Sequence, residues 1–327
     1  MYMVREDARS CGHLGGDADR YSMSVLVIFN PISGRGRARP LAEALVDAMG
    51  KADLEPLLLE SSRDSVEKWL LPELPKHSAV VVVGGDGLVH LVAPYAAQLG
   101  VPILHHPSGT ENLFAREFTG SPKPQSSQTV VERLLKKSLR TVDIASTVTT
   151  DAEGKQSKES MVLMASAGMD ADVVHDVSQA RSGGISKFTY VLPIFKQMLC
   201  WRGVPFHLKV DGKDVIQQGR GMVVIANSAQ YAIRMNPARH AQMDDGQLDV
   251  MILPGRTGFG LCIQGIRCFL GSRYTRDKKV HYRTGKEIEV QHASPCYWQV
   301  DGDPLVGKKP VLGLKVVIEA KPLLVIE

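Results

Sequence analysis

The stretch Val80-Val-Val-Val-Gly-Gly-Asp-Gly87 decides the fold. Four consecutive valines with no polar residue among them are typical of a parallel strand that is buried on both faces. The two glycines that follow allow a turn with positive φ and a close approach of the backbone to a ligand. The helix expected next, over residues 89–99, presents unpaired N–H groups that attract phosphate. An ordinary Asp-Gly turn explains the same four loop residues, so this stretch alone predicts only a strand, a turn and a helix.

The sequence around this stretch repeats the order of strand, loop and helix. Apolar runs predict strands over 24–30, 54–59 and 102–105, and helical spacing of apolar residues predicts helices over 40–49 and 66–71. This alternation over about 100 residues favours a doubly wound α/β domain. The functional loops of such a domain lie at the carboxyl ends of its strands.

Two more loops of this kind follow predicted strands. Asn30-Pro-Ile-Ser-Gly-Arg-Gly36 follows the first strand, and its small residues and arginine suit an anion site. Pro107-Ser-Gly-Thr-Glu-Asn112 follows the fourth strand, where Thr110 and Asn112 either bind phosphate or ribose oxygens or cap the next helix. Three glycine-containing loops at one edge of a sheet favour a nucleotide site over three unrelated turns.

The second half of the chain has a different pattern. After a Pro/Ser/Gln linker and a short helix over 130–139, short strand-like segments separated by turn signals predict a mostly antiparallel β-sandwich domain. We therefore expect a disordered tail (1–22), an α/β nucleotide-binding domain (23–140) and a β-rich substrate domain (141–327). The final run, 311–326, belongs to either domain. The strand-like segments are 141–148, 159–165, 206–210, 221–226, 247–253, 287–291 and 296–300, with helical insertions over 169–201 and 258–270.

Composition excludes several classes of protein. The length of 327 residues suits two domains, and 44% hydrophobic with 23% charged residues is typical of a soluble globular protein. A net charge of +4 suits an anionic ligand or a membrane surface but falls short of a nucleic-acid binder. The five scattered cysteines lack zinc or redox spacing, so we expect reduced thiols in a cytoplasmic protein. We expect neither a membrane span nor a signal peptide.

Taken in order, the motifs resemble the diacylglycerol kinase catalytic domain family, which includes bacterial lipid kinases and sphingosine and ceramide kinases. The three loops match NPxSG, GGDG and PxGTxN. Residues 165–173 resemble the GFDA.V segment of the family, 237–250 its P.A..DDG.LDV stretch, and 300–303 its DGE motif. The resemblance covers residues 24–327. It implies an ATP-dependent kinase that phosphorylates the hydroxyl of a lipid alcohol such as a diacylglycerol or sphingoid base, and thus a role in lipid metabolism and phospholipid biosynthesis.

The resemblance also implies roles for particular residues. ATP would lie between the two domains, with Asp301 as the proton acceptor for the lipid hydroxyl and Asp86 organising the catalytic Mg²⁺. Asp245, with the backbone carbonyls of Gln242 and Gln247, would hold a second, structural Mg²⁺, which is reasonable hard-cation chemistry. Simple turns explain the Asp-Gly sequences at these places equally well. The nucleotide-binding residues would be Asn30, Ser33, Gly34, Gly84, Gly85, Asp86, Gly87, Gly109, Thr110 and Asn112, with Arg35 and Arg37 as candidate cations for the phosphates.

The chain departs from the family pattern at several places. Leu88 replaces a threonine, His90 and Leu91 stand where bacterial members have Asn-Glu, Leu113 replaces an aspartate, and Asp303 replaces a glutamate. The change at Leu91 removes one carboxylate from the nucleotide loop. Two alternatives stay open: an NAD kinase-like enzyme, which shares the GGDG loop, and a non-catalytic nucleotide- or lipid-binding protein of the same fold. The sequence does not identify the lipid, because a fold does not fix a substrate.

Two segments bear on contact with lipid at the inner face of a membrane. Residues 267–286 hold seven basic residues and one acid, Asp277, so they either dock peripherally onto anionic headgroups or form a solvated basic face. The apolar stretch 188–201 lines an acyl-chain pocket or belongs to the core, and the core is the interpretation that we favour.

Overall fold

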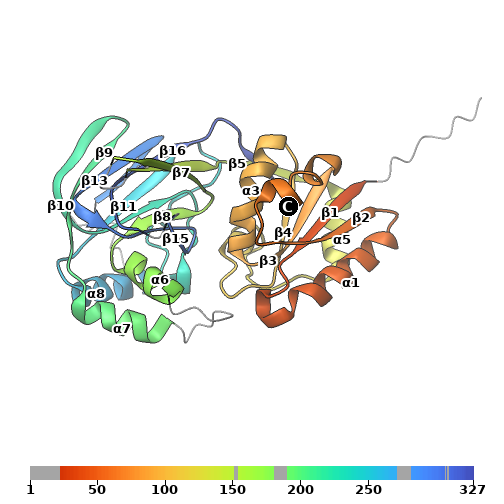
Figure 1. The fold of residues 1–327 in the computed structure, drawn as a ribbon, viewed down its shortest axis with the longest axis horizontal. Helices are drawn as coiled ribbons and strands as arrows, with labels where there is room; N and C mark the ends of the chain where they lie inside the picture. The colour runs from red at the N-terminus through yellow and green to blue at the C-terminus, as the bar shows by residue number, and fades with distance from the viewer. Residues whose placement is uncertain (1–22, 151–153, 180–189, 271–280, 306, 308) are drawn as a thin grey trace, which may run out of the picture.

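The fold is that of a computed structural model, which describes residues 23–150, 154–179, 190–270, 281–305, 307 and 309–327. An α/β domain and a β-rich domain lie side by side (Figure 1). The predicted disordered tail, residues 1–22, and half of the basic segment 267–286 lie outside the described residues.

The first domain is built on a six-stranded sheet with the order β2-β1-β3-β4-β17-β5. All neighbouring pairs are parallel except β17 with β5. The central strand β3 is buried along its whole length because helices cover both faces of the sheet. The strands are β1 (Ser24–Phe29), β2 (Glu55–Glu60), β3 (Ala79–Gly84), β4 (Ile103–Pro107), β5 (Leu139–Val142) and β17 (Leu323–Ile326).

Side chains of the first domain alternate between two cores, one on each face of the sheet. Val25 and Val27 pack with α1 and α5 on one face, whereas Leu26 and Ile28 pack with α2, α3 and α4 on the other. The predicted doubly wound α/β domain is therefore confirmed. Its helices are α1 (Ala38–Gly50), α2 (Val66–Trp69), α3 (Asp86–Leu99), α4 (Leu113–Thr119) and α5 (Ser127–Lys136), with 3-10 turns at Ser33–Gly36 and Leu74–Lys76.

The second domain is a curled antiparallel sheet of eleven strands, which confirms the prediction of a mostly antiparallel β domain. The long strand β10 joins both halves of this sheet, because residues 213–220 pair with β9 and residues 221–226 pair with β11. Within its described residues the domain also contains the helices α6 (Met169–Gln179), α7 (Val191–Cys200) and α8 (Gly258–Phe269) and a 3-10 turn (Ala232–Arg234). The strands are β6 (Ala145–Thr150), β7 (Gln156–Met161), β8 (Met164–Ala167), β9 (Pro205–Val210), β10 (Lys213–Ala226), β11 (Leu248–Pro254), β12 (His281–Gly285), β13 (Glu287–Cys296), β14 (Trp298–Val300), β15 (Asp303–Pro304) and β16 (Val311–Ile318).

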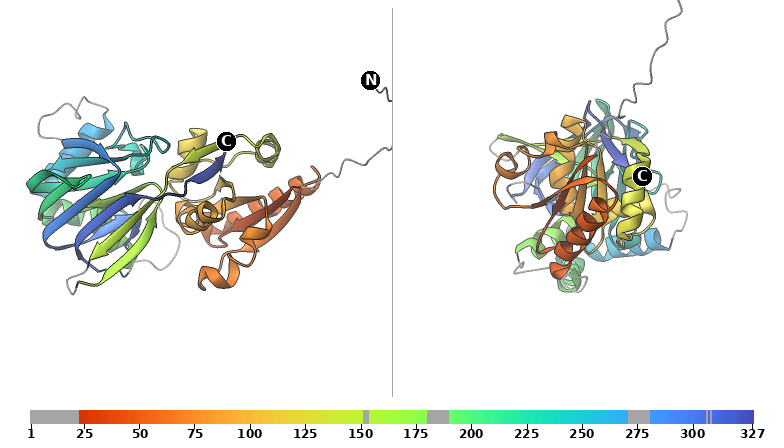
Figure 2. Two further views of the ribbon diagram at one scale, coloured as in Figure 1. Left: turned by 90° about the horizontal axis from the view of Figure 1, so that it is seen from above. Right: turned by 90° about the vertical axis from the view of Figure 1, so that its right-hand side faces the viewer.

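The chain crosses between the domains twice, and both crossings were predicted as single strands. The run 141–148 divides into β5, in the first sheet, and β6, in the second. The run 311–326 divides in the same way into β16 and β17, so the C-terminus ends in the first domain (Figure 2). Two connections side by side limit how far the domains can move apart.

The prediction that the apolar stretch 188–201 belongs to the core is wrong for α7. Trp201 is buried, but none of the ten residues of α7 is. The helix packs on its neighbours α6 and α8 and leaves the rest of its surface to solvent. Residues 188 and 189 lie outside the described part of the chain.

Candidate active site

Three loops meet at the carboxyl edge of the first sheet, because β1, β3 and β4 are adjacent parallel strands. The loop after β1 touches the loop after β4. A Cβ added at Gly34, whose φ is +58°, would lie 2.3 Å from the carbonyl oxygen of Ser108. The Ser108 hydroxyl donates to Ser33 Oγ at 3.0 Å. Only glycine allows both this backbone conformation and this approach.

The loop after β3 touches the loop after β4 in the same way. A Cβ at Gly109 would lie 2.7 Å from the Cα of Gly85. The buried side chain of Asn112 holds the loop: its Oδ1 accepts from Gly109 N at 3.0 Å, and its Nδ2 donates to the carbonyls of Gly109 and Pro122. Asn112 was predicted to bind nucleotide. Its amide is instead used within the loop, while the neighbouring Thr110 is exposed.

The packing of Gly34 gives a test of this loop arrangement. Gly34→Ala is expected to lower the affinity for ATP with Mg²⁺ by about tenfold or more, because the new methyl group must push the two loops apart. Gly36→Ala is the matched control: Gly36 also has a positive φ, +86°, but nothing lies within 4 Å of its added Cβ. Titration calorimetry measures both affinities. Equal losses in the two variants would show that the contact with Ser108 does not shape the nucleotide site.

Asp86 opens α3 and is tied to the neighbouring elements. Its Oδ1 accepts from Phe114 N at 3.0 Å, at the start of α4. Beneath the loop, the buried ring of His105 donates from Nε2 to the carbonyl of Gly84 at 3.1 Å. Burial lowers the pKa of His105, although the charge of Asp86 opposes this shift. The carboxylate of Asp86 is thus fixed at the N-termini of two helices, beside the glycine turn.

Asp301 does not face the space between the loops. Its side chain is only 2% exposed, and Oδ1 accepts from the backbone N–H groups of Leu163 and Met164 at 2.7 and 2.9 Å. Oδ2 accepts from Val162 N at 2.8 Å and from His90 Nδ1 at 2.7 Å. A carboxylate has about four lone-pair positions, and these four donors occupy them. The predicted role of Asp301 as proton acceptor therefore needs correction: in this geometry it holds other groups in place.

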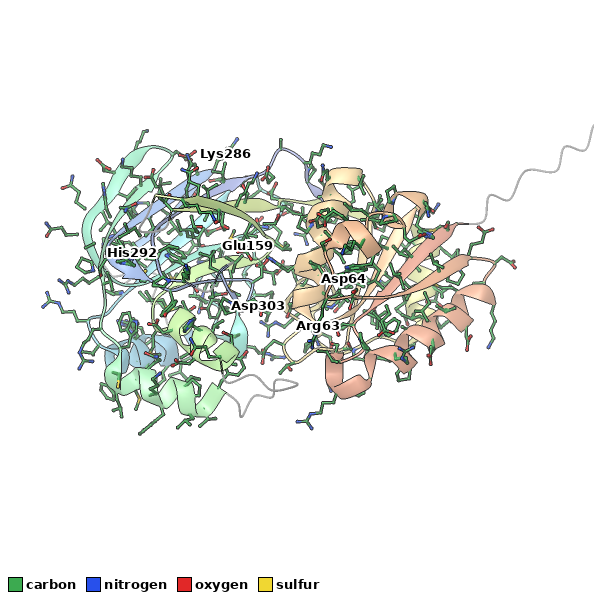
Figure 3. All side chains as sticks on the ribbon, in the orientation of Figure 1. Arg63, Asp64, Glu159, Lys286, His292 and Asp303 are labelled. Carbon is green, nitrogen blue, oxygen red and sulfur yellow. The ribbon has the colours of Figure 1, made fainter. Side chains whose placement is uncertain are left out.

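Asp303 is the carboxylate of the second domain that lies beside the glycine turn. A Cβ added at Gly87 would lie 3.4 Å from Asp303 Oδ2. Asp303 stands on the short edge strand β15, on the side of the second domain that faces the first (Figure 3). The sequence had marked this residue only as a replacement for glutamate. The two domains thus bring Asp86 and Asp303 to the same turn.

His90, on α3 of the first domain, contacts two carboxylates of the second domain. It donates to Asp301 at 2.7 Å, and its Nε2 lies 3.5 Å from Glu159 Oε1 on β7. Burial alone would lower the pKa of His90, but its hydrogen bonds and the charges of Asp301 and Glu159 raise the pKa to about 10. The imidazole is therefore charged at neutral pH. Sequence reasoning noticed His90 only as a departure from the family pattern, because its partners lie far along the chain.

A second interdomain contact comes from α4. The buried guanidinium of Arg116 donates to Gln230 Oε1 at 2.6 Å and to the carbonyl of Tyr231 at 2.8 Å. Glu117 accepts from the hydroxyl of Ser228 at 2.8 Å. Together with the His90 cluster, these contacts set the position of Asp303 relative to the glycine turn.

The predicted structural magnesium site lies at the turn before β11. Asp245 is exposed, and one of its oxygens, Oδ1, accepts from Gln247 N at 2.9 Å. Asp143, which accepts from Gly246 N, has its pKa raised by burial and by the charges of Asp245 and Asp244. Within the described residues no cluster of three or more His, Cys, Asp or Glu is placed to hold a metal. The carboxylates of Asp143, Asp244 and Asp245 lie close together at this turn, and carboxylate oxygens suit a hard cation.

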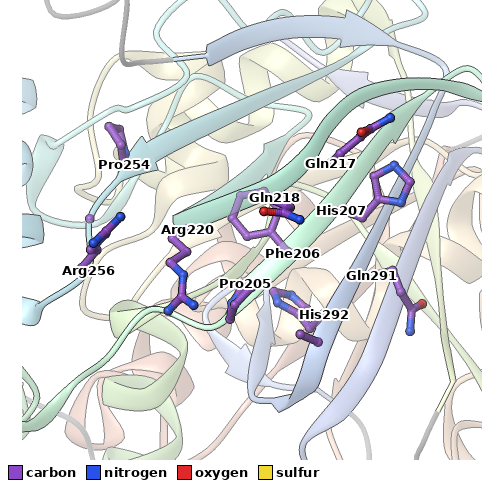
Figure 4. A pocket seen from close by; sticks show the side chains of 12 residues that line it. Pro205, Phe206, His207, Gln217, Gln218, Arg220, Pro254, Arg256, Gln291 and His292 are labelled. Carbon is purple, nitrogen blue, oxygen red and sulfur yellow. The ribbon is translucent and has the colours of Figure 1, made fainter.

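A cavity of about 250 Å³ opens beside the start of α6. It is lined by Gly168 and Asp172 and by residues that include Trp201 and Cys296. The helix α6 also packs on β15, the strand that carries Asp303. Burial, followed by the charges of Asp170 and Asp176, raises the pKa of Asp172 to about 7. A second cavity, of about 790 Å³, lies along β9, β10 and β13 and includes Arg220 and Arg256 (Figure 4).

Asp172→Asn is expected to stabilise the protein at pH above about 7 and to change little near pH 4. The folded-state pKa of Asp172 is above its ordinary value of 3.8, so the stability that its proton contributes is lost as pH rises from about 4 through 7. Asparagine has no charge to bury, and the gain should reach on the order of 1–3 kcal/mol. Urea unfolding across this pH range measures the gain. A difference that does not vary with pH would contradict a protonated Asp172.

Comparison with known proteins agrees with this arrangement. The model of the diacylglycerol kinase catalytic domain matches residues 24–147, and that of the YegS C-terminal NAD kinase beta sandwich-like domain matches residues 163–325. The chain therefore holds a diacylglycerol kinase catalytic domain over residues 24–147, and the two matches together support a kinase as the class of enzyme.

Relatives share this organisation over most of their length. A diacylglycerol kinase of Staphylococcus saprophyticus is 23% identical over 308 residues, covering 90% of this chain and 93% of the relative. One of Mycobacterium tuberculosis is 25% identical over 231 residues, covering 69% and 72%. A crystal structure of a diacylglycerol kinase from Bacillus anthracis has a TM-score of 0.65 at 17% identity, covering 94% of this chain and 97% of that one. None of the helices in the described residues could span a membrane.

Proposed function

We propose that this protein is an ATP-dependent lipid kinase, which transfers the γ-phosphate of ATP to the hydroxyl of a lipid alcohol such as a diacylglycerol or sphingoid base. The main support for the proposal is that three glycine loops of the first domain contact one another and that Asp303 of the second domain lies beside one of them, at Gly87. An anion site on one domain faces a carboxylate on the other. Phosphoryl transfer requires this combination of positioning and charge.

The donor would lie at the carboxyl edge of the first sheet. The N-terminus of α3 and the backbone of Gly84 to Gly87 suit its phosphates, and Asn30, Ser33 and Thr110 border the same edge. Arg37 Nε donates to the carbonyl of Gly34 at 2.9 Å, so this predicted cation also holds the loop.

The reaction needs few groups of the protein. The lipid hydroxyl oxygen attacks the γ-phosphorus, the bond from that phosphorus to the bridging oxygen breaks, and ADP leaves with the electron pair. Asp303 is the group that we propose accepts the hydroxyl proton, because it lies beside the turn and Asp301 is fully hydrogen-bonded. Asp86 would hold the catalytic Mg²⁺, which neutralises phosphate charge when bound. Asp245, with the carbonyls of Gln242 and Gln247, would hold the structural Mg²⁺.

The acceptor would enter from the second domain. The helix α6 contributes Asp172 to the cavity and also packs on β15, so we propose that a polar headgroup held near Asp172 directs a hydroxyl toward Asp303. The acyl chains would stay in the lipid phase or lie along the helices. This arrangement requires peripheral contact with a membrane at its cytoplasmic face, and it involves no nucleic acid.

One alternative has a specific observation in its favour, since the family model of the second domain is described as NAD kinase beta sandwich-like. An acceptor panel of diacylglycerol, sphingosine, ceramide and NAD, incubated with ATP labelled at the γ-phosphate, separates the possibilities. Label in one lipid class supports the proposal and identifies the substrate. Label in NAD alone would overturn it, and ATP binding without transfer to any acceptor would favour a non-catalytic binder.

A further inference from the structure

Two neighbouring helices of the second domain carry apolar residues on their solvent side. On α7 they recur at helical spacing, and on α8 they do the same. Such stripes normally face a core, and monomeric proteins rarely leave large contiguous apolar areas in water. The exposed residues are Val191, Leu192, Phe195 and Leu199 on α7, Phe259, Ile263 and Ile266 on α8, and Leu270 directly after α8. We call these eight residues the apolar platform.

The two helices form one rigid unit. A Cβ added at Gly258, the first residue of α8, would lie 2.3 Å from the carbonyl oxygen of Gln197 and 2.8 Å from the Cα of Met198 in α7. Gly258 N donates to the carbonyl of Trp201 at 3.3 Å, and Arg202 pairs with Thr257 in a β-bridge. In Figure 1 both helices lie at the lower edge of the second domain, with α6 next to them. The platform therefore moves with the domain that contains the acceptor cavity.

The charged residues within the two segments that form the platform are all basic. Residues 191–202 and 254–270 contain no Asp or Glu, and they contain Lys196, Arg202, Arg256 and Arg267. Lys196 is paired with Asp176 at 2.9 Å, while Arg202 and Arg256 are exposed where the two helices meet. An apolar surface bordered by cations, with no acid in either segment, matches the interface of an anionic bilayer.

We propose that the apolar platform docks this protein onto anionic lipid bilayers. The proposal rests on the proposed function in one respect, because a lipid acceptor has to be reached from a bilayer. On docking, the eight side chains enter the boundary between headgroups and acyl chains, and Arg202 and Arg256 lie at the headgroup phosphates. The platform adjoins α6, so docking brings the cavity near Asp172 to the membrane surface.

The charge of the platform segments favours an anionic bilayer, rather than a second copy of the chain, as the partner of the platform. A symmetric dimer through the platform would place the same cations opposite one another without an acid from either helix to compensate. An anionic bilayer supplies that compensation and covers the apolar area at the same time.

Vesicle flotation tests the proposal without any measurement of activity. The double variant Phe195→Glu with Ile266→Glu changes side chains that are 55% and 58% exposed. Leu135→Glu on α5 is the matched control, since Leu135 is 54% exposed in the first domain. With phosphatidylcholine–phosphatidylglycerol vesicles, we expect the double variant to lose about tenfold or more in partitioning per substitution, and the control to bind like the unmodified protein. Binding of the unmodified protein should weaken as the salt concentration rises, and it should also be weaker to vesicles made of phosphatidylcholine alone.

Two further readouts complete the test. Light scattering should show the same mass for the unmodified protein and the double variant. A dimer that the double variant converts to monomer, without vesicle binding by either, would overturn the proposal in favour of self-association. Phosphate transfer to an acceptor in detergent micelles should be unchanged in the double variant. If neither protein transfers phosphate but only the unmodified one floats with vesicles, docking stands and the proposed kinase function fails.

Discussion

Asp86→Asn is expected to lower the rate of phosphate transfer by about 10³-fold or more, with little change in stability. The carboxylate sits at the glycine turn, at the N-termini of α3 and α4, where triphosphate and Mg²⁺ would lie. Asparagine keeps an oxygen that accepts from Phe114 N, so the loop should keep its shape. Removing the negative charge removes the group that would hold the cation. Initial rates at saturating ATP, together with thermal unfolding, measure both effects.

Asp47→Asn is the matched control for Asp86. Asp47 is exposed on α1, away from the loop edge, so its replacement should leave the rate within about twofold. A rate for Asp86→Asn within about tenfold of the unmodified protein would show that the carboxylate does not take part in the chemistry.

His90→Leu is expected to destabilise the protein by about 3 kcal/mol and to slow phosphate transfer as well. The change removes the cation that Asp301 and Glu159 share at the domain interface. Because the pKa of His90 is raised to about 10 in the folded state, its contribution is fully present below pH about 6.5 and is lost as pH rises through about 10. The difference in unfolding free energy between the two proteins should therefore shrink over this window.

Chemical unfolding at several pH values measures this difference. The double variant His90→Leu with Glu159→Leu should recover part of the lost stability, because it also removes one of the two acids that His90 contacts. A stability loss that is the same at every pH, with no recovery in the double variant, would mean that His90 acts only by packing.

The fold of the first domain could be predicted because its signals are local. The valine run of β3 is buried on both faces, and β1, β3 and β4 each end in a loop that contains glycine. In the second domain, strand positions were recognisable but their sheets were not. Nothing in the run 141–148 shows that β5 pairs with β17 while β6 pairs with β16. Such pairing depends on contacts between segments far apart in the chain.

The same limit explains the outcome at the site. The three glycine loops were identified from spacing, and the structure brings them together. The environments of Asp301 and Asp303 were not predictable, since two residues of one turn point to different partners. His90 and Asp301 are separated by 211 residues, so their contact left no pattern in the sequence. The exposure of α7 was also missed, because an apolar stripe alone does not show which surface will cover it.

The most direct test of the central claim is the transfer of labelled γ-phosphate from ATP to diacylglycerol in mixed micelles, measured in the organic extract. We predict Mg²⁺-dependent label in phosphatidic acid for the unmodified protein, and almost none for Asp86→Asn or Asp303→Asn. If diacylglycerol stays unlabelled, another lipid of the acceptor panel should take its place with the same dependence on both residues. Label that appears in no lipid, or that persists in both variants, would contradict a lipid kinase site formed by the two domains.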